Sequence, residues 1–164
     1  VFPYLQKNLD DIITVPDEDL IVSFLDMVEN HKMIVENSGL LTVAALKHLG
    51  VKDKRVVSIL SGGNMDVITM SSVVQQGLIF RDRIFTVSVL LPDKPGELAK
   101  VAQTLADVQG NVIKLEHNQF VTTNRSAAVE LRITLECFGT EHKEQIIAAL
   151  EKKGYKPRIV RTMI

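Results

Sequence analysis

The sequence predicts an α/β protein of two segments, and three observations support this. In residues 1–80, short runs of β-branched and other apolar residues alternate with stretches of helical spacing, which is typical of a parallel sheet with connecting helices. In residues 81–164, apolar and polar residues alternate with a period of two, and the expected elements follow the order βαββαβ. The first segment holds 6 basic and 10 acidic residues (net −4), and the second holds 13 and 10 (net +3).

The elements of the first segment follow from its apolar spacing and from the residues that end strands and helices. A short strand is expected at Ile12–Val15, where Pro16 ends it. A helix is expected from Asp17, because its acidic first turn suits the positive end of a helix dipole. We then expect a strand, a helix, a strand and a helix, at Met33–Val35, Leu40–Leu49, Val56–Leu60 and Met65–Gln76.

Two features indicate that this first segment belongs to a longer protein. A parallel sheet of two or three strands is too small to cover its own faces. The chain also opens with Val1-Phe2-Pro3-Tyr4, without an initiator methionine. We therefore interpret residues 1–80 as the end of a larger domain.

The stretch Arg55–Asp66 is the candidate centre of the first segment. Its apolar run suits a strand buried on both faces, and Ser61-Gly62-Gly63-Asn64 ends that strand before a helix. In α/β proteins, ligands bind where a strand ends in such a turn. The alternative is a tight turn without a ligand, in which the glycines supply unusual dihedral angles and Ser61 or Asn64 caps the helix.

The second segment begins after a boundary that we place in Gly77–Arg83, giving domains at 1–80 and 81–164. We expect strands at Phe85–Leu91, Asn111–Val121, Val129–Cys137 and Tyr155–Val160. Two helices alternate with them, one from Pro95 to Gln109 and one that carries Ile146, Ile147 and Leu150 and ends at Gly154. This order is the ferredoxin-like split βαβ unit.

Composition excludes several classes of function. The net charge of −1 argues against a nucleic acid or an anionic membrane surface as the main partner. No apolar run approaches the roughly 20 residues of a membrane helix. Cys137 is the only cysteine, so an internal disulfide or a cysteine metal cluster is excluded, and the cytoplasm is the expected compartment.

Other site chemistries lack support in the sequence. The histidines have no metal-ligand spacing, and we expect structural roles for His31, His48, His117 and His142. RNA-recognition modules share the βαββαβ order but need stacking aromatic residues on the central strands. Val129–Cys137 has none, and we expect Phe85 and Phe120 to be core or interface residues.

The residues also resemble two known families. Met33–Leu49, Val56–Asp66 and Gly77-Leu78 resemble the C-terminal part of the large domain in threonine dehydratases (threonine ammonia-lyases), pyridoxal-phosphate enzymes of the tryptophan-synthase-β fold type (fold type II). Pro92-Asp93-Lys94-Pro95-Gly96-Glu97-Leu98 resembles the signature turn of the ACT domain, an amino-acid-sensing module. A catalytic tail followed by one ACT domain is similar to the shorter threonine dehydratases.

The first resemblance implies a cofactor contact. In that family the serine matching Ser61 hydrogen-bonds the pyridine nitrogen of pyridoxal phosphate, and Gly62, Gly63 and Asn64 would shape the turn. A hydroxyl cannot hold the pyridine protonated as a carboxylate would, so one residue tunes the electronics of the cofactor. Glu36 falls in a family segment near the cofactor, and a surface or structural role for it is equally open.

The catalytic machinery of the family is incomplete in this sequence. Its Schiff-base lysine and glycine-rich phosphate loop are not matched, and the lysines of the first segment stand in polar contexts without neighbours that would desolvate an amine. We therefore predict no catalytic residue in this fragment and no activity from the fragment alone.

The second resemblance implies an effector site and a dimer. Asp93 would take the ammonium of an amino acid, and Lys94 and Gly96 lie in the same turn. Asn111 and Val112 would close the site from a partner subunit, and isoleucine or valine is the expected ligand. The split βαβ order leaves the strand Arg83–Leu91 next to a sheet edge, and such edges invite pairing with a second copy. The alternative is a well-capped turn without a ligand.

Three functions remain. The first is the C-terminal region of a threonine dehydratase, which as a full protein would convert L-threonine to 2-oxobutanoate and ammonia in isoleucine biosynthesis or catabolism, and L-serine to pyruvate as well. The second is a stand-alone amino-acid-sensing module without catalytic ancestry. The third, a serine-racemizing relative, is disfavoured because those enzymes usually lack an ACT domain.

Overall fold

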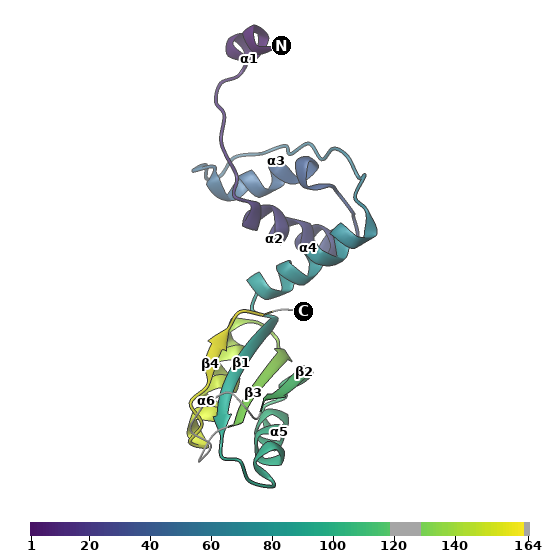
Figure 1. Ribbon diagram of the computed structural model, residues 1–164. Helices are drawn as coiled ribbons and strands as arrows, with labels where there is room; N and C mark the ends of the chain where they lie inside the picture. The colour runs from purple at the N-terminus through teal and green to yellow at the C-terminus, as the bar shows by residue number, and fades with distance from the viewer. Residues whose placement is uncertain (119–128, 163–164) are drawn as a thin grey trace. The chain divides into compact units, whose positions relative to one another are not determined.

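The computed structural model describes residues 1–118 and 129–162, and these form two compact units, Val1–Gly77 and Leu78–Ile164 (Figure 1). The predictions that the second strand of the second segment ends at Val121 and that Phe120 is a core or interface residue fall outside the described residues.

The second unit has the predicted βαββαβ order, and the ferredoxin-like fold is confirmed. Its elements are β1 (Ile84–Leu91), α5 (Glu97–Asp107), β2 (Asn111–Asn118), β3 (Val129–Glu136), α6 (Thr140–Lys152) and β4 (Arg158–Val160). The sheet has the order β2-β3-β1-β4, and each pair of neighbours is antiparallel.

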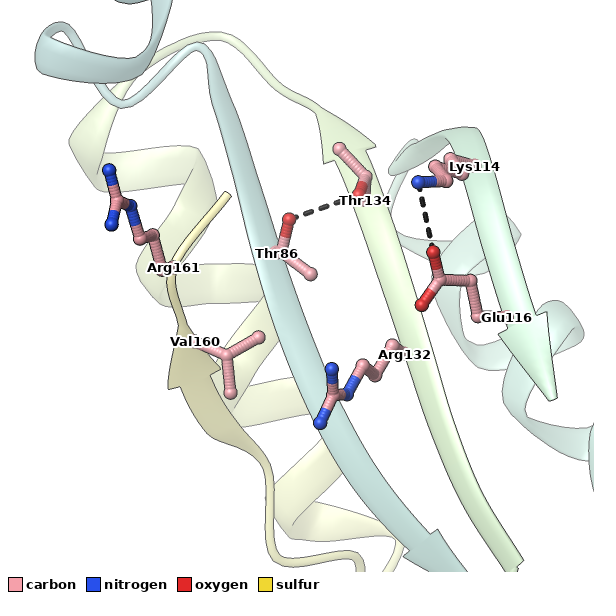
Figure 2. A pocket seen from close by; sticks show the side chains of 7 residues that line it. All are labelled: Thr86, Lys114, Glu116, Arg132, Thr134, Val160 and Arg161. Carbon is pink, nitrogen blue, oxygen red and sulfur yellow. Dashed lines mark hydrogen bonds and ion pairs between the residues drawn. The ribbon is translucent and has the colours of Figure 1, made fainter. Parts of the chain in front are cut away.

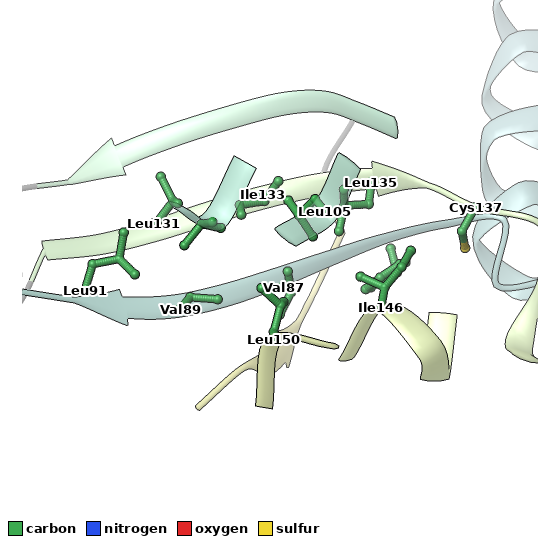
Figure 3. Packing of buried hydrophobic residues seen from close by; sticks show 12 residues of the cluster. Val87, Val89, Leu91, Leu105, Leu131, Ile133, Leu135, Cys137, Ile146 and Leu150 are labelled. Carbon is green, nitrogen blue, oxygen red and sulfur yellow. The ribbon is translucent and has the colours of Figure 1, made fainter. Parts of the chain in front are cut away.

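The core of this unit lies between one face of the sheet and the two helices (Figure 3). Alternate residues of β1 and β3 point into it, as a period of two requires. They pack against apolar residues spaced along α5 and α6, so both helices cover the same face. The buried set includes Val87, Val89, Leu131, Ile133, Leu135, Val101, Leu105, Ile146 and Leu150. The polar residues between them form the open face of the sheet.

The sheet order decides which strands can pair with another chain. β1 does lie next to an edge strand, but β3 and β4 flank it, so its own backbone groups are already paired. The edges are β4, with only three residues, and β2, with eight. β2 exposes three large apolar side chains along its length, namely Val112, Ile113 and Leu115. The long open edge of the sheet is therefore β2, and the expectation that Arg83–Leu91 offers an edge for pairing is wrong.

The first unit is built from helices and extended segments. Its first helices are α1 (Phe2–Asn8) and α2 (Asp17–Asp26), and α2 continues into a π turn at Met27–His31. A helical segment follows at residues 37–48, where α3 (Leu41–Ala44) lies between two 3-10 turns, Asn37–Leu40 and Ala45–His48. The last helix is α4 (Val67–Phe80). Buried residues of these elements form one cluster around Phe24 and Leu40. Gly77 lets α4 approach α2 closely, because an added Cβ would lie 3.3 Å from the side chain of Leu25.

The strands predicted for this unit are wrong. None of residues 1–77, all of which are described, lies in a strand. A strand needs a neighbour for its backbone N–H and C=O groups. Val56–Leu60 is tied instead to the helical segment, because the Thr42 hydroxyl donates to the carbonyl of Ile59 at 2.8 Å. The parallel sheet predicted for residues 1–80 is therefore not formed within them.

Candidate functional site

The turn Ser61–Asn64 is held by the turn at residues 36–39. The carboxylate of Glu36 accepts the backbone N–H of Asn64 at 3.2 Å through one oxygen and the Ser38 hydroxyl at 2.7 Å through the other. The backbone N–H of Glu36 also donates to the carbonyl of Gly62 at 3.4 Å. Two segments about 25 residues apart in the sequence thus meet through one acidic side chain.

Two glycines make this contact possible. A Cβ on Gly39 would lie 1.5 Å from the carbonyl oxygen of Ser61, so only glycine lets the two backbones approach this closely. Gly62 has a φ of +76°, and a Cβ there would lie 2.4 Å from the Glu36 carboxyl group. Gly62 is therefore required by both its backbone conformation and its neighbour.

The hydroxyl of Ser61 remains available to a ligand. The alternative role as a helix cap belongs to another residue, because Asp66 accepts the N–H groups of Ile68 and Thr69 at 3.0 and 2.9 Å. Hydrogen bonds from Thr69, first from its hydroxyl and then from its N–H, lower the pKa of Asp66 below its ordinary value. Ser61 is exposed, and its hydroxyl has no hydrogen-bond partner among the described residues.

The turn of the second unit, residues 92–96, leads from β1 into α5. Gly96 precedes the helix with a φ of +90°, a conformation that favours glycine. The backbone N–H of Lys94 donates to the carbonyl of Pro92 at 2.8 Å, and Asp93 is exposed. No atom lies within 4 Å of a Cβ built on Gly96, so dihedral angle rather than space requires glycine there.

Asn111 and Val112 lie at the other end of the sheet from this turn. β1 and β2 both run antiparallel to β3, so they point in the same direction. Asn111 is in register with Glu136, and Glu136 with Ile84, the first residue of β1. Seven steps along β1 separate that end from Leu91, about 24 Å at ~3.4 Å per residue. One chain therefore does not bring Asp93 and Asn111 together.

A third location, on the open face of the sheet, carries a cavity of about 210 Å³ (Figure 2). The hydroxyls of Thr86 and Thr134 lie 3.0 Å apart in its floor, and both residues are buried. Lys114, Arg132 and Arg161 surround them. Sequence reasoning missed this group, although the alternation of β1 and β3 could have placed both threonines on one face.

The histidine with most contacts has a structural role. The Nε2 atom of His142 lies 2.6 Å from the carbonyl of Val108, and its Nδ1 accepts the N–H of Phe138 at 3.1 Å. These two bonds connect α6 to the end of α5 and to Phe138, the second residue after β3. Burial raises the pKa of the Cys137 thiol. Within residues 1–118 and 129–162, no three potential ligand side chains gather as a metal site would need.

No helix in the described part of the chain is long and apolar enough to cross a membrane.

Comparisons with known proteins match part of the chain to one family and most of it to several relatives. Residues 85–154 match the ACT domain family. An L-threonine ammonia-lyase from Geobacter sulfurreducens is 33% identical over 156 residues (94% of this chain, 39% of the relative), and one from Thermotoga maritima is 31% identical over 160 (97% and 40%). The chain thus spans about 40% of the length of these relatives.

Two further comparisons are more distant. The L-threonine dehydratase biosynthetic IlvA of Pasteurella multocida is 28% identical over 158 residues, which cover 94% of this chain and 30% of the relative. The regulatory subunit of aspartate kinase from Thermus flavus superposes with a TM-score of 0.39 and 21% identity, over 47% of this chain and 50% of that one.

Proposed function

We propose that this chain, a homologue of the threonine ammonia-lyases whose residues 85–154 are an ACT domain, acts within a longer enzyme that converts L-threonine to 2-oxobutanoate and ammonia. Residues 1–80 are its contribution to the catalytic domain, and residues 81–164 regulate that domain. The name of the Pasteurella relative states a biosynthetic role, and we extend that role, in isoleucine synthesis, to this protein. The lone Cys137 suits the reducing cytoplasm.

The first unit supports this proposal by its unpaired segment. Val57 and Ile59 are 88% and 73% exposed, although such a run is typical of a buried strand. Exposed apolar side chains, on a segment whose backbone has no strand beside it in residues 1–77, suit a strand that adds to a sheet formed by other residues of the longer protein. The turn at Ser61 would then follow the end of that strand, where ligands bind in α/β sheets.

The chemistry of this turn fits pyridoxal phosphate. We propose that Ser61 donates a hydrogen bond to the pyridine nitrogen, and that Gly62 and Gly63 bring the backbone close to the ring. Pyridoxal phosphate, when bound, supplies the electron-withdrawing ring that threonine deamination needs. The hydroxyl of Ser61 is neutral and has no partner among the described residues, so no internal bond must break before it contacts the ring. Glu36 and Gly39 would hold the turn in place.

The test of the catalytic part uses the longer enzyme with Ser61→Ala. We expect the variant to fold and to lose most of its turnover, because it lacks the proposed contact to the pyridine nitrogen. Ser58→Ala is the matched control, since the Ser58 hydroxyl donates to the Thr42 carbonyl at 3.3 Å and faces a different neighbour. Release of 2-oxobutanoate and the absorption of bound cofactor are measured. Wild-type turnover in Ser61→Ala would remove the proposed role.

The second unit supports an effector site shared between two copies. If two β2 edges pair antiparallel about a two-fold axis, Asn111 of the partner subunit lies beside the far end of this copy's β2, near Asn118. Asn118 is in register with Glu130, and Glu130 with Leu90, which stands just before the turn at 92–96. We therefore propose that Asp93, Lys94 and Gly96 of one copy and the partner's Asn111 and Val112 enclose isoleucine or valine.

Mixed dimers test this arrangement. Asp93→Ala and Asn111→Ala should each abolish the heat of isoleucine or valine binding in calorimetry while sedimentation still reports a dimer. A mixture of the two variants should regain binding, because each mixed dimer has one site with both residues intact. Gly96→Val should weaken binding through the positive φ at this position. A monomer that releases no heat with any amino acid contradicts this part of the proposal and leaves the Ser61 site unaffected.

A further inference from the structure

The cavity on the open face of the sheet serves none of the functions proposed above. It lies on the face opposite α5 and α6, so no helix of the second unit that the structure describes packs on it. The register places Lys114, Thr134, Thr86 and Val160 in one row across all four strands. A molecule bound there would contact every strand of the sheet.

The cations of the cavity differ in how fully they are paired. Lys114 contacts Glu116, the one acidic residue of the lining, at 2.9 Å. Arg132 uses its Nε–H on Glu130 at 3.1 Å, and the Ser88 hydroxyl donates to the same carboxylate at 2.7 Å. The bond to Glu130 uses the Nε–H of Arg132 and not the two terminal nitrogens of its guanidinium group.

Arg161 follows β4 and is exposed on the rim of the cavity. It forms no hydrogen bond or ion pair with any residue that the structure describes. The lining thus has three cationic side chains and one carboxylate, and Arg161 has no counter-charge among residues 1–118 and 129–162.

The floor adds hydrogen-bonding capacity. The hydroxyls of Thr86 and Thr134 form one hydrogen bond between them, at 3.0 Å, and this uses only one of their two protons. The other proton can be donated to a ligand in the cavity. A cross-strand threonine pair stabilises a sheet by itself, but it does not explain the unpaired arginine beside it.

We propose that this cavity is a binding site for a small oxyanion, with the Thr86–Thr134 hydroxyl pair as its floor and the guanidinium groups of Arg132 and Arg161 turning in over a bound anion. Guanidinium groups suit this role because their planar array of donors matches the oxygens of a phosphate or a carboxylate. Small-molecule pockets usually measure about 300–1,000 Å³. A cavity of about 210 Å³ is large enough to hold a phosphate-sized group.

Nuclear magnetic resonance of the whole 164-residue chain tests the proposal. The protein is titrated with inorganic phosphate, with succinate and with sodium chloride at the same ionic strength. We expect phosphate to shift the amide signals of Thr86, Thr134 and Lys114 until the shifts reach a plateau. Chloride should shift the same signals without a plateau. Saturation by succinate at lower concentrations than phosphate assigns the site to carboxylates, and equal saturation by both assigns it to oxyanions in general; both belong to the proposed class. Equal responses to chloride and to both oxyanions overturn the proposal.

Three variants separate a built site from general attraction of anions. Arg161→Gln should weaken phosphate binding at least fivefold. Lys156→Gln removes the same charge from an exposed residue outside the lining and should leave binding unchanged. Thr86→Val retains the shape of the side chain and should weaken binding by removing a hydroxyl. Equal losses in Arg161→Gln and Lys156→Gln would show only a diffuse electrostatic effect and would contradict the proposed site.

Discussion

Replacement of Gly39 by alanine probes the contact between the turns at 36–39 and 61–64. The new Cβ would lie 1.5 Å from the carbonyl oxygen of Ser61 and 2.7 Å from its carbonyl carbon. Since the oxygen belongs to the backbone, no rotamer change can relieve the clash. The two turns must separate by about 2 Å to restore an ordinary contact distance. Overpacking of this kind costs about 1–3 kcal/mol.

The expected result is specific to one location. Gly39→Ala should lower the free energy of unfolding of the first unit by about 1–3 kcal/mol in urea, as followed by far-UV circular dichroism. It should also displace the amide signals of Gly62, Gly63 and Asn64. In the longer enzyme it should lower affinity for the cofactor.

Gly50→Ala provides the matched control. A Cβ at Gly50 meets no atom within 4 Å, and its φ is not positive. This variant should be neutral or more stable by about 0.4–1 kcal/mol, because alanine lowers the entropy of the unfolded chain. If Gly39→Ala left the Gly62–Asn64 amides in place and matched Gly50→Ala in stability, the reasoning from close backbone contact would be refuted.

Three further predictions follow from individual contacts. Glu36→Gln retains an acceptor but loses the charge, and should lower the free energy of unfolding by about 1 kcal/mol. It should also speed hydrogen exchange at the Asn64 amide, measured by NMR, and unchanged exchange would argue against the hydrogen bond between Glu36 and Asn64. The Lys143 hydrogen bond holds the pKa of Asp82 below its usual range, so this carboxylate stabilises the fold above its unfolded pKa and ceases to do so as pH falls through the folded value. Asp82→Asn should therefore lose about 0.5–1 kcal/mol at pH 7 and approach wild type in acid unfolding below about pH 4. His142→Ala leaves the carbonyl of half-buried Val108 and the N–H of Phe138 without their partner and should cost about 1–3 kcal/mol by urea unfolding, whereas a loss below about 0.5 kcal/mol would exclude a structural role.

Sequence patterns predicted the second unit well because the residues that define each of its strands and helices are close together in the sequence. The alternation in Val129–Glu136 specifies which side chains enter the core, and glycines end both helices near the expected residues. The helix before β2 begins at Glu97 rather than Pro95, because Gly96 occupies the capping position in a left-handed conformation. Strand order required knowledge of the register, which places β1 inside the sheet and leaves β2 as the long edge.

The first unit shows where local patterns are insufficient. Val56–Leu60 has the composition of a buried strand, but a strand is a relation between two segments, and residues 1–77 offer no second one. The turn at Ser61 could be located by its glycines. Its attachment to Glu36 and Gly39 could not, because a contact between segments about 25 residues apart leaves no periodic signal. The helix cap at Asp66 was missed for another reason, since two other polar residues, Ser61 and Asn64, stood nearby as candidates.

The contact between Gly39 and Ser61 connects the turn at residues 61–64 to α2 through the helical segment between them. The Ser61 peptide bears directly on the start of the helical segment at residues 37–48. At the other end of that segment, the imidazole of His48 lies 2.7 Å from the carboxylate of Asp19, near the start of α2. We therefore expect a displacement of the Ser61 backbone to be transmitted to α2 through the helical segment at residues 37–48. The NMR signals of the His48 ring should therefore change when a ligand binds at Ser61, and they can be measured without catalytic turnover.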